Sequence, residues 1–151
     1  MMTPPNIVAA RRFIEIATRS EHPTIAQLAR SLDELALSYH DTPLGNPDDR
    51  DEWPEPGSRV DQADIGARFP DLGYYGVADP LNVPGEVLVG DAIDDILDIA
   101  NDVKEVVWRF DRFGADDANW HFRFLFRIHW GRHLRDLAGY LHSRIVIEAQ
   151  E

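Results

Sequence analysis

Two histidines and a series of aspartates are the residues of this chain whose types and spacing could support chemistry. His129 and His133 lie four residues apart, the spacing at which one helix face presents two imidazoles to a single metal ion. The glutamate of the H-E-x-x-H metalloprotease motif is missing, because Trp130 and Gly131 follow His129. We therefore expect no metal ion and no cofactor, with both histidines hydrogen-bonded inside an aromatic core. A metal site at His129 and His133 is the alternative.

An acidic stripe is the second candidate. Its members fall within about a third of one helix circumference, since each residue turns roughly 100°: they are Asp91, Asp94, Asp95, Asp98, Asp102 and Glu105. Two D-x-x-D pairs in the stripe would suit magnesium, as in all-helical nucleotide pyrophosphohydrolases. Such sites also need carboxylates from a facing helix. The only aspartates after Gly114 are Asp116, Asp117 and Asp136, none at a matching spacing.

The stripe belongs to a wider concentration of negative charge. Residues 41–102 contain 16 acidic and three basic residues, a net charge of −13, whereas the whole chain carries −12. Such a field repels phosphate and anionic lipid, so we expect neither nucleic acid nor a membrane as partner. A basic protein is the expected partner, with Asp91, Asp94, Asp95, Asp98 and Asp102 as its docking surface.

Hydrophobic periodicity predicts helices that would position these groups. One helix follows Pro4 and Pro5 and ends before Pro23, and a second begins at a capping-box pattern of Thr24 and Gln27. A third runs from about Gly90 to Phe113, where Gly114 marks its end. Asp116 or Asp117 is the expected N-cap of the fourth.

The fourth helical segment is ambiguous in its first half. Large apolar residues occupy every second position from Trp120 to Trp130, alternating with His, Arg, Leu, Arg and His. This period is typical of a strand, but no second long strand is available to pair with it. We favour one helix from about Asp117 to Glu148. Residues at equal sequence distances before and after Gly114 should then lie level with each other on the two helices. This pairing predicts a polar network across the hairpin. In it, Arg123 or Arg127 pairs with Asp98, Asp102 or Glu105.

These elements predict an all-α fold, a compact bundle of about four main helices in a single domain over residues 1–151. A mobile acidic, proline-rich loop at 41–59 and an ordered irregular segment at 60–89 connect the second helix to the helical hairpin at 90–148. The chain contains no cysteine, no signal-peptide pattern and no apolar run of membrane-spanning length, which indicates a cytoplasmic protein.

Three segments resemble a known family. They are Y-Y-G-V-A-D-P at 74–80, D-D-I-L-D-I-A-N-D-V-K at 94–104, and W-H-F-R-F with I-H-W-G-R-H between 120 and 133. In this order they are similar to the uncharacterised bacterial family called domain of unknown function 5063, over residues 69–142. Phe122, Ala100 and Arg127 depart from the family's pattern, where tryptophan, tyrosine and an acid are expected. The resemblance implies a bacterial, largely helical domain and carries over no activity.

Three functions from different classes follow from the sequence. The first is a non-catalytic interaction or regulatory protein, of the immunity or antagonist kind, whose acidic surface binds a basic protein. The second is a divalent-metal-dependent hydrolase of the nucleotide pyrophosphohydrolase type, built on the D-x-x-D pairs. The third is a small-ligand or zinc-binding helical module around His129, His133 and Trp130. The absence of a specific catalytic motif favours the first.

Overall fold

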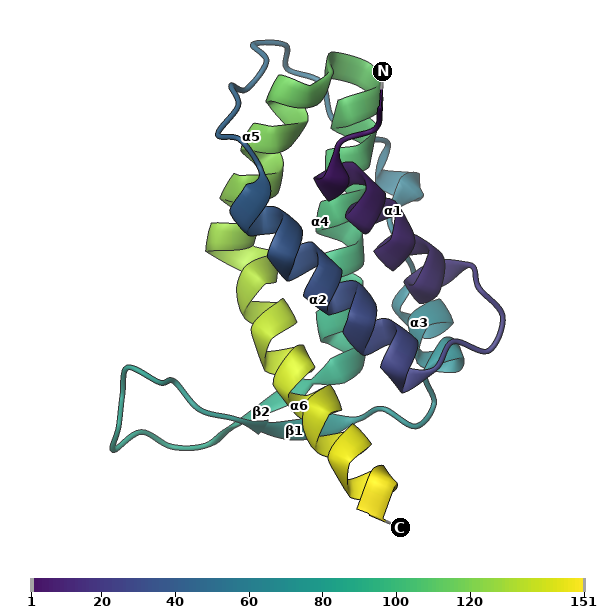
Figure 1. The fold of residues 1–151 in the computed structure, drawn as a ribbon, viewed down its shortest axis with the longest axis vertical. Coiled ribbons are helices and arrows are strands. Elements are labelled where there is room, and N and C mark those ends of the chain that lie inside the picture. Colours follow the sequence, from purple (N-terminus) through teal and green to yellow (C-terminus); the bar gives the residue numbers. More distant parts are fainter. Residues whose placement is uncertain (1, 151) are drawn as a thin grey trace.

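The chain folds as packed helices from which one β-hairpin projects (Figure 1). The computed structural model describes residues 2–150. Its long elements are α1 (Pro5–Thr18), α2 (Ile25–Asp41), α4 (Ala92–Phe113), α5 (Ala115–Leu125) and α6 (Gly131–Gln150). A π-helical turn, η2 (Phe126–Trp130), joins α5 to α6. The short elements are a 3₁₀ turn, η1 (Pro56–Ser58), the helix α3 (Gln62–Arg68) and the strands β1 (Tyr74–Val77) and β2 (Leu88–Asp91). The expected helical fold is confirmed.

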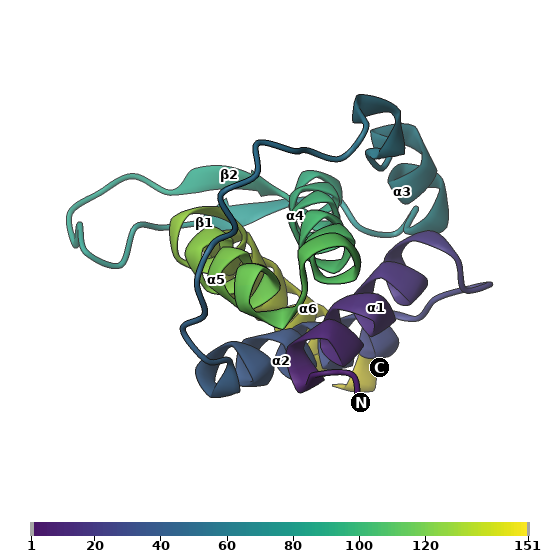
Figure 2. The ribbon, with the colours of Figure 1, turned by 90° about the horizontal axis from the view of Figure 1, so that it is seen from above.

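The helices α1 and α2 form one side of the core. The predicted capping box is present, because the Thr24 side chain accepts from the Gln27 backbone N–H while the Gln27 side chain accepts from the Thr24 N–H. From that start, one face of α2 places Leu28, Leu32 and Leu35 in the core with no exposed surface. Seen from above, α1 and α2 lie on one side of α4 and the α5–α6 path (Figure 2).

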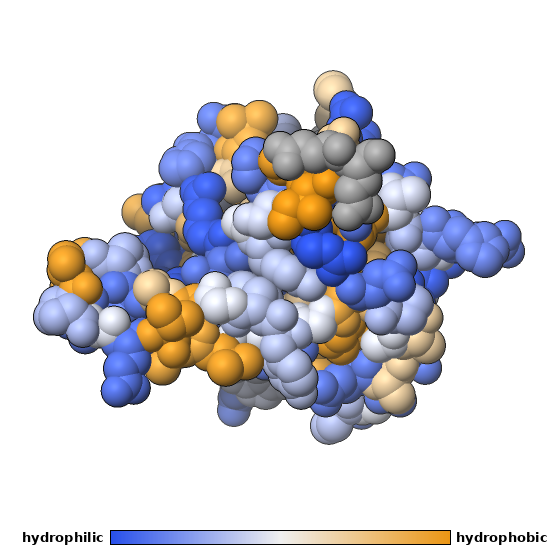
Figure 3. Space-filling view, turned by 90° about the horizontal axis from the view of Figure 1, so that it is seen from below, coloured by the Kyte–Doolittle hydropathy of each residue, from blue (hydrophilic) through white to orange (hydrophobic). Residues whose placement is uncertain are grey.

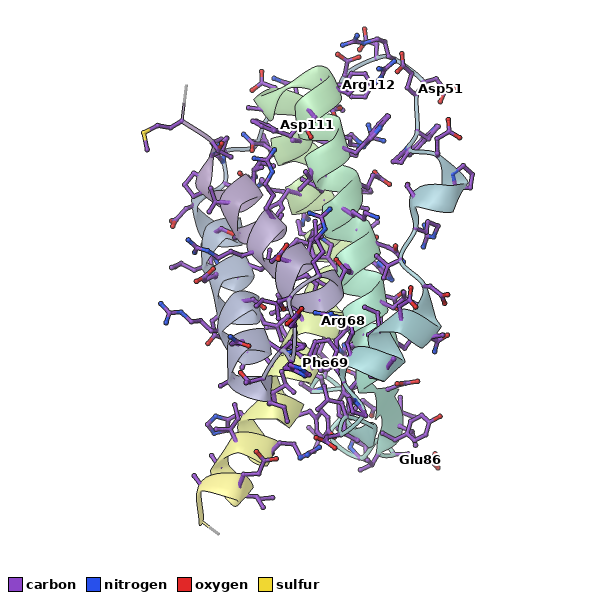
Figure 4. The ribbon with its side chains drawn as sticks, turned by 90° about the vertical axis from the view of Figure 1, so that its right-hand side faces the viewer. Asp51, Arg68, Phe69, Glu86, Asp111 and Arg112 are labelled. Carbon is purple, nitrogen blue, oxygen red and sulfur yellow. The ribbon has the colours of Figure 1, made fainter. Side chains whose placement is uncertain are left out.

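The short helix α3 closes the end of α1. Arg68 donates to the carbonyl oxygens of Ile16 and Ala17, each at 2.7 Å. These carbonyls lie in the last turn of α1, where they lack partners within the helix. Figure 4 shows Arg68 and the adjoining Phe69 at this position, beneath the end of α1. The segment at 60–89 contains α3 and β1 and the start of β2, and through Arg68 it helps to hold the N-terminal helices.

The turn between α4 and α5 is the tightest in the bundle. Gly114 has a φ of 98°, a conformation that favours glycine, and its N–H bonds to the carbonyl of Phe110. The predicted helix end at Gly114 is confirmed. The predicted cap of the next helix is wrong, because Gly114 itself precedes α5 and both Asp116 and Asp117 lie in its first turn.

The segment with alternating aromatic residues is helical, so the strand alternative is wrong. Its alternation does not follow burial: Phe122 and Trp130 are fully buried, but Phe124 is 41% exposed and Ile128 is 63% exposed. The expected single helix is nevertheless interrupted at η2, where the chain makes a wider turn before α6 begins. This turn determines which side chains after it face α4.

The acidic connection crosses the end of the bundle and is attached at several points. The Asp117 carboxylate accepts from the Asp48 backbone N–H at 2.8 Å, and Glu52 pairs with Arg112. Farther along, the Asn101 side chain accepts from the Val60 N–H at 2.8 Å. Figure 4 shows Arg112, at the end of α4, beside this loop. The connection then continues through α3 to the two antiparallel strands, which pair Tyr74 with Asp91 and Val77 with Leu88.

No helix in the described part of the chain is both long enough and apolar enough to cross a bilayer.

Candidate metal centre

The first half of α4 presents carboxylates toward the α5–α6 path. The helix begins at Asp91, whose side chain accepts from the backbone N–H groups of Ile93 and Asp94. Asp95, Asp98 and Asp102 follow at spacings of three and four residues, which places them on one face. Asp95 is only 5% exposed. A buried carboxylate needs partners, and here they come from the facing helix.

The π turn η2 supplies those partners. Gly131 donates its N–H to the carbonyl of Phe126, five residues earlier, which is the π-helical pattern. A side chain at residue 131 would place its Cβ 2.3 Å from that same oxygen, so glycine fits this position closely. Trp130 is fully buried against Phe122 and Phe126, which fixes the turn in the core. His129 and His133 then face α4.

The two imidazoles converge on one carboxylate. The Nε2 atom of His133 lies 3.2 Å from Oδ2 of Asp98, and that of His129 lies 3.9 Å from the same oxygen. One ligand atom from each of the three residues lies within 4.8 Å of the other two. Ligand atoms held about 2.1 Å from one tetrahedral ion are about 3.4 Å apart, so this spacing is close to that of a metal site.

The other nitrogen of each imidazole is held by a different carboxylate. Nδ1 of His129 donates to Asp102 at 2.6 Å, and Nδ1 of His133 donates to Asp95 at 2.7 Å. With each Nδ1 as the donor, each Nε2 faces Asp98: it carries a hydrogen when the imidazole is charged and offers its lone pair when the imidazole is neutral. Metal-binding histidines commonly have such a carboxylate behind them, which fixes the tautomer and the ring orientation.

Tyr75 connects this arrangement to the β-hairpin. Its hydroxyl donates to the second oxygen of Asp95, and its ring stacks on that of Tyr140 with centroids 4.7 Å apart. Burial, and then the hydrogen bond to Asp95, raises the pKa of Tyr75, so the hydroxyl remains a donor. The sequence analysis did not identify Tyr75 as a site residue, because it belongs to a hairpin that no sequence pattern connects to α4.

The electrostatics of the cluster favour a bound cation. The hydrogen bond to Asp95 raises the pKa of His133, against the opposing effect of burial, and Asp98 adds to the increase. Burial raises the pKa of Asp102 despite its hydrogen bond to His129. Burial and the neighbouring Asp98 raise the pKa of Asp94. Several carboxylates therefore compete for few positive charges, and a divalent ion would relieve this repulsion.

The predicted arginine network is wrong in the described residues. Arg123 donates to the Thr42 carbonyl at 3.0 Å and lies over the Tyr39 ring, so it faces α2. Arg127 is exposed and has no carboxylate within ion-pair distance. Glu105 pairs instead with Arg109 of its own helix at 2.9 Å. The count from Gly114 placed the arginines level with the carboxylates but ignored the direction in which they point.

The acidic stripe is not the free surface that the sequence suggested. Asp91 caps its helix, while Asp95, Asp98 and Asp102 face the histidines. The facing helix supplies imidazoles in place of the carboxylates that a D-x-x-D magnesium site requires. Of the acids after Gly114, Asp117 binds Arg109 and the Asp48 N–H, away from the stripe.

Comparison with known proteins supports the fold alone. No family model matches the chain, and no match was found among curated proteins. The crystal structure of protein BF1032 from Bacteroides fragilis is similar, with a TM-score of 0.68 and 18% sequence identity. The match covers 92% of this chain and 89% of BF1032. The family resemblance seen in the sequence therefore stays an expectation.

Proposed function

We propose that this protein is a metal-binding helical domain that holds one divalent transition-metal ion at Asp98, His129 and His133. One observation carries the proposal: both Nε2 atoms converge on Asp98 while both Nδ1 atoms are held by separate carboxylates. Two imidazole nitrogens and one carboxylate oxygen suit zinc or iron(II) better than magnesium, which prefers oxygen ligands alone. This favours the third function considered from the sequence over the expectation of a metal-free protein.

The number of ligands indicates what such an ion would do. Structural zinc sites are closed by four protein ligands, whereas reactive sites use three and leave a position for water or a substrate. The His129 side chain is 41% exposed, and His133 and Asp98 are about a quarter exposed, so solvent can reach the ion. A metal ion lowers the pKa of bound water, which makes hydrolysis the first reaction class to assay.

The acidic docking surface for a basic protein has less support as a function. It requires free carboxylates on α4, but three of its five candidate residues face the histidines. A bound cation would further reduce the negative charge there. Exposed acids such as Asp49, Asp51 and Glu55 remain in the connection at 41–59.

Metal titration tests the proposal directly. Protein stripped with a chelator is titrated with zinc by calorimetry, and with cobalt(II) by visible absorption, which reports the ligand geometry. We expect one ion per chain, and we expect the variants His133→Ala and Asp98→Asn to lose it. His142→Ala is the matched control, because His142 is an exposed histidine of the same helix outside the cluster. A wild-type protein that binds neither ion, or equal loss in the control, would refute the proposal.

A further inference from the structure

The segment that joins β1 to β2 is an exposed apolar arm. Every residue from 78 to 87, which we call the arm, is exposed. Leu81 is 92% exposed, Val83 is 93% exposed and Val87 is 73% exposed. The arm extends away from the helices in two views (Figures 1 and 2), and Figure 3 shows apolar surface along this projection. Exposed apolar side chains gathered in this way are typical of interaction surfaces.

The base of the arm is rigidly attached, so its direction is determined by the fold. Tyr75 stacks on Tyr140, and the Ala92 N–H bonds to the Gly73 carbonyl at 3.1 Å. Beyond Val77 and Leu88 the strand pairing ends. A two-stranded hairpin is only marginally stable in water without packing. Among the described residues, the outer half is held by hydrogen bonds of its own turns, such as those from Asn82 to Asp79 and from Gly85 to Asn82, and its side chains are not covered by the helices. It is therefore free to dock elsewhere.

A groove of suitable character lies beside the base of the arm. It has a volume of about 410 Å³ and runs between β1 and α6, where Val77, Arg135 and Tyr140 are among its lining residues. Arg135 lines this groove, is exposed and forms no ion pair with any described residue. The neighbouring Asp136 is already paired with Arg132 at 3.0 Å. The groove thus offers one uncompensated positive charge.

The arm carries the complementary charge. Its sequence, A-D-P-L-N-V-P-G-E-V, contains Asp79 and Glu86 and no basic residue. Glu86 lies on the hairpin at the end of the bundle opposite to Arg112 (Figure 4). Arm and groove therefore match in charge. Because the arm points away from its own body, the partner whose groove it fits is a second copy.

We infer that two copies of this chain associate by exchanging arms, each arm lying in the groove between β1 and α6 of the other. The contact occurs twice around a two-fold axis, the usual symmetry of homodimers, so it closes and does not propagate into filaments. The apolar tip supplies the buried area, while Asp79 or Glu86 meets Arg135 and sets the orientation. This inference is independent of the metal ion.

Sedimentation and light scattering over a concentration series test it. We expect wild-type dimers, and we expect two variants, Leu81→Ser/Val83→Ser and Arg135→Glu, to raise the dimer dissociation constant by about tenfold or more. Leu81 and Val83 lie outside the core, and Arg135 loses only a contact 6.0 Å from the Phe126 ring centroid, so both chains should fold, as circular dichroism will check. Leu44→Ser is the control, because Leu44 is 70% exposed in a different loop and should have no effect.

Mixing the two variants distinguishes arm exchange from other dimers. The Leu81→Ser/Val83→Ser chain has an intact groove, and the Arg135→Glu chain has an intact arm. A mixed dimer therefore retains one of two contacts, whereas each variant alone retains none, so mixing should restore association. A wild-type monomer at every concentration overturns the inference. So does a dimer unaffected by Arg135→Glu, which would indicate arm-to-arm strand pairing, or a mixture that stays monomeric.

Discussion

The Nδ1 atom of His133 lies 2.7 Å from a carboxylate oxygen of Asp95, a side chain that is 5% exposed. This pair makes His133 more than a packing residue. A buried carboxylate that accepts from Nδ1 fixes the ring so that its Nε2 faces Asp98. The same kind of hydrogen bond joins Asp102 to Nδ1 of His129, which lies one helical turn before His133. Two oriented imidazoles on one carboxylate are the arrangement on which the proposed metal site rests.

The carboxylates behind the histidines should tune metal affinity without supplying ligands. We predict that Asp102→Asn weakens zinc binding by about 10- to 100-fold, since the amide orients His129 less firmly and makes it less basic. The site should still bind one ion, unlike Asp98→Asn. Competition with a chromophoric chelator measures the affinity. Asp111→Asn is the control, because Asp111 lies on the same helix and pairs with Arg11 at the surface. Equal affinity in Asp102→Asn and wild type would contradict this role.

The raised pKa of His133 predicts opposite pH dependences for the metal-free protein and for metal binding. A group whose pKa is higher in the folded state than its ordinary value of 6.5 stabilises the fold most fully below that value. This contribution is lost as pH rises through the folded-state pKa. The thermal stability difference between metal-free wild type and His133→Gln should therefore shrink as the pH rises. Zinc affinity should increase over the same range, because the ion requires a neutral imidazole.

Thermal unfolding in a chelator and zinc titration across the same pH series measure the two trends. His142→Gln provides the comparison for an exposed histidine that has no carboxylate partner among the described residues. If the stability difference grows with pH, the Asp95–His133 pair does not act as described.

Tyr75 should stabilise the fold through its hydroxyl. Tyr75→Phe keeps the stacking on Tyr140 but removes a donor from buried Asp95. We predict a loss of about 1.5–3 kcal/mol in the free energy of unfolding, the range for hydrogen bonds to charged groups. Urea denaturation at neutral pH measures it. Tyr74→Phe is a matched control on the adjoining residue, which is 75% exposed, and should change stability by less than about 0.5 kcal/mol. Similar losses in both variants would contradict the prediction.

Local signals made most of the helices predictable. The capping box of Thr24 and Gln27 and the glycine at 114 depend only on residues a few positions apart, and both were confirmed. The residues of the proposed metal site were also visible in the sequence, as two histidines four apart and aspartates at helical spacing. The sequence analysis expected no metal ion because the glutamate of H-E-x-x-H is missing. That glutamate serves catalysis, and in the proposed site the third ligand, Asp98, belongs to another helix.

The sequence did not reveal which side chains after Gly114 face α4. Equal counting from Gly114 assumes two uniform helices, and it led to Arg123 and Arg127 as the partners of the α4 carboxylates. Arg123 lies before the π turn, and it faces α2 because of its own position on the α5 surface. The π turn at 126–130 inserts an extra residue into one turn and rotates the residues that follow it. The sequence analysis did not predict this turn, in which Trp130 packs against Phe122 and Phe126.

The π turn should depend on the missing side chain at residue 131. We predict that Gly131→Ala destabilises the protein by about 1–3 kcal/mol, because the new Cβ would lie 2.3 Å from the Phe126 carbonyl oxygen and the backbone must shift. Gly139→Ala is the matched control on the same helix, since nothing lies within 4 Å of its added Cβ. There, alanine should stabilise the helix by about 0.5–1 kcal/mol.

The two glycine variants also test whether the turn positions the metal site. A shift of the backbone at residue 131 moves His133 relative to His129, so Gly131→Ala should weaken zinc binding in addition to lowering stability. Gly139→Ala should bind zinc as the wild type does. Urea denaturation and zinc titration of the same samples separate the two effects. If Gly131→Ala loses stability but binds zinc with unchanged affinity, the π turn serves the core and not the site; if it loses neither, the close approach to Phe126 does not constrain this residue.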